Sequence, residues 1–123
     1  EAQFRFGFTN ALSEQEAHEL YSKYAMPGHG RPLFQVATAM FNPNSANKVN
    51  VANPSRGPLL LISGDKDNTV PPVLVKSTLR VYKSSPAVTE IKEFAGRGHS
   101  LTIDSGWHEL AEYCLAWLKG KGL

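Results

Sequence analysis

From residue 59 onward, the sequence alternates between strand-like and helix-like segments, and this alternation constrains the fold most. The run Leu59-Leu60-Leu61-Ile62 is uniformly apolar, which is typical of a strand buried on both faces in a parallel sheet. Pro71 and Pro72 suit the start of a helix, and residues 88–94 favour a second strand. Strand, helix and strand in so short a stretch predict a βαβ unit.

A final amphipathic helix is predicted after the second strand. Its apolar side chains recur at helical spacing: Trp107, Leu110, Ala111, Cys114, Leu115 and Leu118. Either Asp104 or Ser105 is expected to cap the start of this helix. Cys114 lies on the apolar side, so we expect a core residue, and a single cysteine excludes an internal disulfide.

The first part of the chain has a different texture, rich in Asn, Pro, Gly and scattered aromatic residues. Ser13 and Glu16 form a capping box, in which each side chain is expected to accept from the backbone N–H of the other residue. A helix should therefore begin there and end before Pro27. Residues 31–41 are expected to form a second short helix.

Turn-forming residues at 53–58 mark a boundary between these two parts. We therefore expect a helical segment over residues 1–56, followed by a β-α-β-α unit with parallel strands over residues 57–123. The fold class is α/β.

The composition excludes several classes of protein. With 41% hydrophobic residues, the chain can bury a core, so disorder is not expected. The net charge is +2 with both signs scattered, so no basic run favours nucleic acid. No apolar run approaches the roughly 20 residues that cross a bilayer. We expect a soluble, cytoplasmic protein, with secretion left open.

An acid and a histidine follow the two predicted strands at equal spacing. Asp67 lies five residues after Ile62, and His99 lies five residues after Phe94. The carboxyl ends of parallel strands meet at one edge of a sheet, where ligands commonly bind. A carboxylate there can hold the Nδ1 proton of an imidazole, as in a nucleophile–His–acid triad. Asp65 is the competing acid, and we expect it to be structural.

Two stretches resemble the α/β-hydrolase fold family. Residues 60–71, Leu-Leu-Ile-Ser-Gly-Asp-Lys-Asp-Asn-Thr-Val-Pro, are similar to its acid loop, and Gly98-His99-Ser100 before a helix is similar to its histidine loop. The resemblance covers residues 58–123. It implies that Asp67 is the triad acid and His99 the triad base, and that residues 1–56 correspond to a cap or lid.

The chain departs from this family in one respect. None of its ten serines stands in a Gly-x-Ser-x-Gly elbow, so both nucleophile and oxyanion hole are missing. We therefore expect the C-terminal part of an esterase-like α/β-hydrolase, inactive by itself, acting on a small-molecule ester only when completed. No cofactor or metal is expected.

Substrate contacts are expected from the cap. Phe34, Met40 and Phe41 could line an apolar substrate pocket, or they could simply hold the cap together. His18, His29 and His108 are expected at the surface.

Two other functions stay open at this point. The chain could be a non-catalytic, self-associating module, or it could belong to a relative that cleaves epoxides or haloalkanes with a carboxylate nucleophile. Two strands alone leave an open sheet edge, so we expect a companion chain or a dimer.

Overall fold

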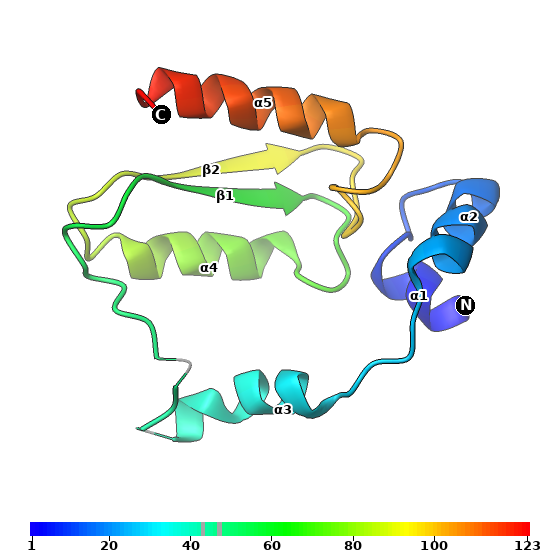
Figure 1. The fold of residues 1–123 in the computed structure, drawn as a ribbon, viewed down its shortest axis with the longest axis horizontal. Helices are drawn as coiled ribbons and strands as arrows, with labels where there is room; N and C mark the ends of the chain where they lie inside the picture. Colours follow the sequence, from blue (N-terminus) through cyan, green and yellow to red (C-terminus); the bar gives the residue numbers. More distant parts are fainter. Residues whose placement is uncertain (43, 47) are drawn as a thin grey trace.

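The structure is a computed structural model that describes residues 1–42, 44–46 and 48–123, without the side chain of Met40. It is a small α/β fold (Figure 1). Its elements, in chain order, are α1 (Ala2–Gly7), α2 (Glu14–Tyr24), α3 (Arg31–Thr38), the 3-10 turn η1 (Ala39–Phe41), β1 (Leu59–Gly64), α4 (Pro72–Tyr82), β2 (Thr89–Phe94) and α5 (Trp107–Gly120).

The two strands form a parallel sheet, as the alternation predicts. The register runs from Leu59 opposite Thr89 to Gly64 opposite Phe94, and α4 connects the strands. The βαβ prediction is therefore confirmed. The prediction that Pro71 and Pro72 introduce a helix is also confirmed, because Pro72 is the first residue of α4.

Helices α4 and α5 cover opposite faces of this sheet (Figure 1). Glu93 of β2 forms an ion pair of 2.9 Å with Lys76 of α4. Glu90 of the same strand accepts a 2.7 Å hydrogen bond from the Trp117 indole of α5 and pairs with Lys121. Since side chains alternate between faces along a strand, these contacts place one helix on each side. The same two donors lower the pKa of Glu90 below its usual value.

The hydrophobic core lies between the sheet and α5. Phe94, Leu101 and Leu110 are buried, and Ile62, Tyr113 and Cys114 pack against them with partial exposure. The rings of Phe94 and Tyr113 meet edge to face, with centroids 5.8 Å apart. Cys114 therefore packs where the helical periodicity predicted it.

Strand β1 is less buried than the sequence predicted. Residues 59–62 are only partly buried, although their uniform apolarity favoured a strand covered on both faces. The physical reason is that the sheet of the described residues has two strands, so the second edge of β1 has no neighbouring strand.

Arg56 ties together the amino-terminal ends of both strands. Its guanidinium donates to the carbonyl oxygens of Ala87 and Val88, at 3.1 and 2.9 Å, and also to the Thr89 hydroxyl. The same group lies over the ring of Tyr82 at 5.2 Å. The boundary predicted at residues 53–58 is therefore anchored to the sheet.

Helix α2 begins as predicted, but its capping box is only half formed. The Ser13 hydroxyl accepts from the backbone N–H of Glu16 at 3.2 Å. The Glu16 carboxylate accepts instead from the backbone N–H of Ser105, at 2.6 Å, before α5. This long-range bond takes the place of the expected return bond to Ser13. Helix α1 was not predicted, because six residues carry too little periodic pattern.

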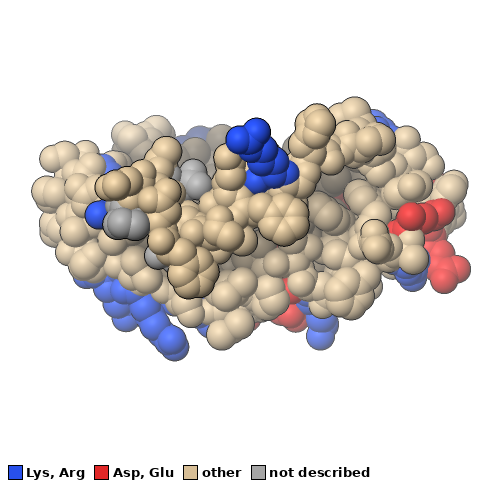
Figure 2. All heavy atoms as spheres, turned by 90° about the horizontal axis from the view of Figure 1, so that it is seen from below, with Lys and Arg blue, Asp and Glu red and all other residues tan. Residues whose placement is uncertain are grey.

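Helix α3 and η1 together form a segment that we call the arm, residues 31–41. The prediction of a short helix here is confirmed, with a tighter last turn. Among the described elements, α3 and η1 contact only each other. The arm lies beyond α4, on a largely uncharged face of the molecule (Figures 1 and 2). In the described part of the chain, no helix has the length and apolarity to cross a membrane.

Candidate functional site

Asp67 and His99 meet at the carboxyl edge of the sheet. Strands β1 and β2 end at Gly64 and Phe94, and each continues into a loop that carries one of the two residues. The Nδ1 atom of His99 lies 2.8 Å from Oδ2 of Asp67. The expectation that these loops bring an acid and a histidine together is therefore confirmed.

The carboxylate of Asp67 is held on both oxygens. Oδ1 accepts from the backbone N–H groups of Thr69 and Val70, each at 2.8 Å, while Oδ2 faces His99. Asp67 is only 8% exposed. One oxygen thus shapes the turn and the other orients the imidazole. With the carboxylate ionised, Nδ1 of His99 is the donor and Nε2 remains an acceptor.

The two loops approach each other through their backbones. The N–H of Lys66 donates to the carbonyl of Arg97 at 2.9 Å, and the N–H of Arg97 donates to the Asp65 carboxylate at 3.2 Å. A side chain on Gly64 would collide with the Arg97 carbonyl and lie 2.8 Å from that of Gly98. Glycine at 64 is therefore required by this approach. Asp65 is structural, as predicted.

Arg97 organises the histidine loop, and sequence reasoning missed it. Its guanidinium pairs with Asp104, which is 1% exposed, and donates to the carbonyl oxygens of Gly106 and Leu101 at 3.1 and 3.3 Å. An arginine seven residues before an aspartate in one loop was the available signal. Most pairs of opposite charge at a protein surface contribute little to stability, so the spacing alone does not indicate a buried ion pair.

Asp104 does not cap α5 in the expected way. The N-cap of α5 is Gly106, which has no side chain to accept a bond. Asp104 instead accepts from the N–H of Gly106 at 3.0 Å, one position ahead of the helix, while pairing with Arg97. The cap prediction was wrong because the Asp104 carboxylate forms a buried ion pair with Arg97.

A pocket of about 280 Å³ lies beside the pair. It is bordered by Asp67, His99 and mostly apolar side chains: Ile62, Val70, Val75, Leu101, Thr102 and Leu110. Val75 belongs to α4 and Leu110 to α5, which cover opposite faces of the sheet. The pocket therefore lies past the rim of the sheet, where a bound molecule could reach the imidazole.

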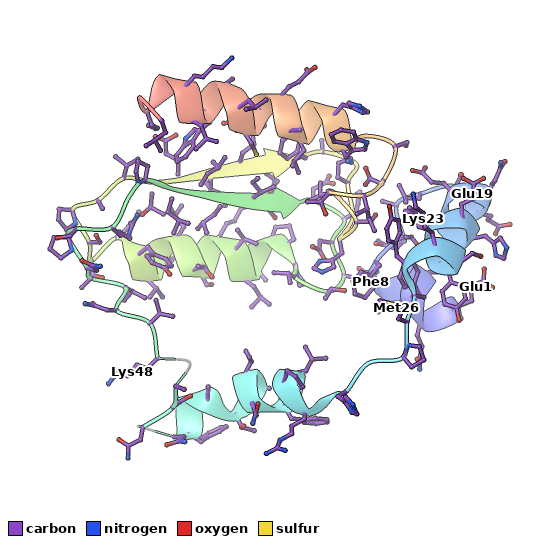
Figure 3. All side chains as sticks on the ribbon, in the orientation of Figure 1. Glu1, Phe8, Glu19, Lys23, Met26 and Lys48 are labelled. Carbon is purple, nitrogen blue, oxygen red and sulfur yellow. The ribbon has the colours of Figure 1, made fainter. Side chains whose placement is uncertain are left out.

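Residues 6–10, which we call the clasp, connect the N-terminal helices to both loops. Phe8 lies between α1 and the ends of the strands (Figure 3). Its carbonyl oxygen accepts from the N–H of Ser100 at 3.1 Å, next to His99. The Asn10 amide donates to the carbonyl of Lys66 at 2.7 Å, next to the acid loop. The clasp therefore holds both halves of the site.

The predicted substrate-binding residues do not reach the pair. Phe34 and Phe41 are 73% and 80% exposed and belong to the arm, which contacts no strand and no helix outside itself among the described elements. Neither residue borders the pocket beside Asp67 and His99. Met40 was predicted with them, and its side chain lies outside the described residues. Their role in binding stays a prediction.

The remaining histidines lie at the surface, as expected. His18 pairs with Glu1 at 2.8 Å, His29 is exposed, and His108 stacks on Trp107 with ring centroids 3.6 Å apart. Over residues 1–42, 44–46 and 48–123, no three His, Cys, Asp or Glu side chains form a group that could hold a metal ion.

Comparison of the chain with protein-family models, curated proteins and solved structures finds no match.

Proposed function

We propose that Asp67 and His99 are the acid and base of a nucleophile–His–acid triad in an esterase-like hydrolase of the α/β-hydrolase family. This chain would supply the C-terminal part of the enzyme. The observation that carries the proposal is the 2.8 Å contact between Asp67 Oδ2 and His99 Nδ1, in which the turn fixes the other carboxylate oxygen.

The chemistry follows from this orientation. A serine hydroxyl supplied from outside these 123 residues would give its proton to His99 Nε2 while its oxygen attacks the ester carbonyl. Asp67 would stabilise the resulting imidazolium. The imidazolium then returns the proton to the leaving alkoxide, and water repeats the sequence to release the acid. The oxyanion-hole donors would come from the same external segment.

The neighbouring pocket supports an apolar substrate. Six of the eight residues that border it are Ile62, Val70, Val75, Leu101, Thr102 and Leu110, and five of those six are aliphatic. An apolar acyl or alcohol group beside His99 would remove that surface from water. We propose a small-molecule ester as the substrate class.

The first experiment is labelling with a fluorophosphonate, which reacts with activated serines, followed by mass spectrometry of the labelled peptide. We expect no label on the isolated chain. In the protein that joins this chain to its nucleophile segment, we expect the label on that segment, lost in His99→Ala. A label within residues 1–123 would contradict the proposal. Epoxide turnover without any label would point to a carboxylate nucleophile instead.

One observation favours a second candidate, a non-catalytic module that associates with itself. The second edge of β1 has no described neighbour, and β1 is only partly buried. Light scattering after size exclusion separates the two functions. A stable dimer of the 13.5 kDa chain that takes no label in any assembly would favour the module.

A further inference from the structure

We propose that Phe8 is a positioning residue for His99, and that the clasp sets the geometry of the Asp67–His99 pair. The inference rests on the proposed function for its catalytic meaning. The geometry itself belongs to this chain and is testable without turnover.

Phe8 restrains the tilt of the His99 ring, which the bond to Asp67 leaves free. The contact with Asp67 restrains His99 at Nδ1, yet one hydrogen bond still allows the ring plane to tilt. The ring of Phe8 meets that of His99 edge to face, with centroids 4.9 Å apart and planes at 77°. Aromatic pairs prefer this arrangement, so the contact selects one ring orientation. The direction of Nε2 is then defined.

The same residue also holds the backbone of the histidine loop. The Phe8 carbonyl accepts from the N–H of Ser100, the residue after His99. The clasp reaches the acid loop as well. The Asn68 side chain donates to the carbonyl of Phe6 at 2.9 Å, and the Thr69 hydroxyl donates to that of Gly7 at 2.6 Å. One short segment therefore sets the separation of the two loops.

The ring of Phe8 also packs against a row of further aromatic rings. Phe4 of α1 stacks on it, with centroids 5.2 Å apart and planes at 10°. Phe4 in turn meets Tyr21 of α2 edge to face at 5.5 Å. The row Tyr21, Phe4, Phe8 and His99 connects α2 to the imidazole. A shift of α2 would therefore be transmitted to His99.

The test is NMR of the ¹⁵N-labelled chain, reading the Nδ1 proton of His99 and its exchange with water. In the native chain we expect a downfield, slowly exchanging signal, because Asp67 accepts this proton. Phe8→Ala should speed its exchange about threefold to tenfold, the range that one aromatic pair supports. Phe8→Tyr should restore slow exchange. Circular dichroism checks that each variant is folded.

The matched control is Phe6→Ala. Phe6 lies in the last turn of α1, which Phe8 follows directly as the C-cap residue. Phe6 is 69% exposed, against 40% for Phe8, and its bond to Asn68 is made by the backbone carbonyl. We expect its Nδ1 signal to match the native chain. An equal loss in Phe6→Ala would mean that general weakening of α1 is responsible, and would overturn the inference. Should Phe8→Ala not fold, Phe8→Leu serves in its place.

The outcomes separate this inference from the proposed function. Unchanged exchange in Phe8→Ala, with a native Nδ1 signal present, overturns the positioning role alone. Faster exchange in Phe8→Ala, together with a joined protein that takes no fluorophosphonate label, supports the positioning role and overturns the proposed function. A native chain without a protected Nδ1 proton overturns both.

Discussion

The clasp and the arm come from the same helical segment of the sequence, yet they differ in how they are attached. The clasp gives backbone carbonyl oxygens to Asn68, Thr69 and Ser100. The arm contacts no other element among the described residues, and its aromatic side chains face outward. These bonds attach the clasp through its backbone carbonyl oxygens. Every residue has such a group, so a sequence pattern does not show which of them will be used.

The largest expected effect concerns the site that the clasp holds. In the protein joined to its nucleophile segment, His99→Ala should lower kcat by about 10⁶-fold, because the base is lost. Asp67→Asn should lower it by about 10⁴-fold, because the orientation of the base is lost. Ester hydrolysis under saturating substrate measures this. Asp65→Asn is the control, because among the described residues that carboxylate accepts from the Arg97 N–H, whereas Asp67 is the carboxylate that faces His99. A greater loss at Asp65 would mean that the acid is misassigned.

The next effect concerns the stability of the histidine loop. Arg97→Ala leaves the buried Asp104 carboxylate without its cation, which should cost about 3–5 kcal/mol of unfolding free energy. Urea unfolding measures the loss. Adding Asp104→Asn should recover part of it, because the stranded charge is removed. Arg80→Ala, on the exposed side of α4, should have little effect. Equal losses at both arginines would contradict the ion-pair account.

Two glycines sharpen the comparison at the level of the backbone. Gly64→Ala places a methyl group against the carbonyl oxygens of Arg97 and Gly98, so we expect a loss of about 1–3 kcal/mol. Gly28, before the arm, has nothing within 4 Å of the same position. Gly28→Ala should stay within about 0.5 kcal/mol of the native chain. Thermal unfolding of both variants tests whether the close approach of the acid and histidine loops is tightly packed while the chain before the arm is open.

The smallest effect is expected in the arm. Phe34→Ala and Phe41→Ala should each change stability by less than about 0.5 kcal/mol, because both rings are already exposed. Phe94→Ala, in the core, should cost about 3–5 kcal/mol. A loss above about 1 kcal/mol at Phe34 would mean that the arm is packed in solution. In the joined protein, a raised KM at unchanged kcat in Phe34→Ala or Phe41→Ala would support the predicted role of the arm in substrate binding.

Local sequence patterns were enough to predict the sheet, four of the helices (α2, α3, α4 and α5) and the meeting of Asp67 with His99. Each of these follows from residues close in sequence, or from the rule that parallel strands end together. The burial of β1 was overestimated, because apolarity shows what a strand can bury and not whether a neighbour exists. Arg97 and Phe8 were missed as contacts, since their partners are chosen by the folded loops.

The long reach of the clasp has a consequence for the order of folding. Its bonds span 62 residues between Asn68 and Phe6, and Glu16 reaches 89 residues to Ser105. Closing such loops costs entropy that only the finished sheet can offset. We expect the strands and α4 to assemble first, and α1 and α2 to dock last. During synthesis, the N-terminal helices would leave the ribosome long before their docking site exists, and would wait unattached until the histidine loop emerges.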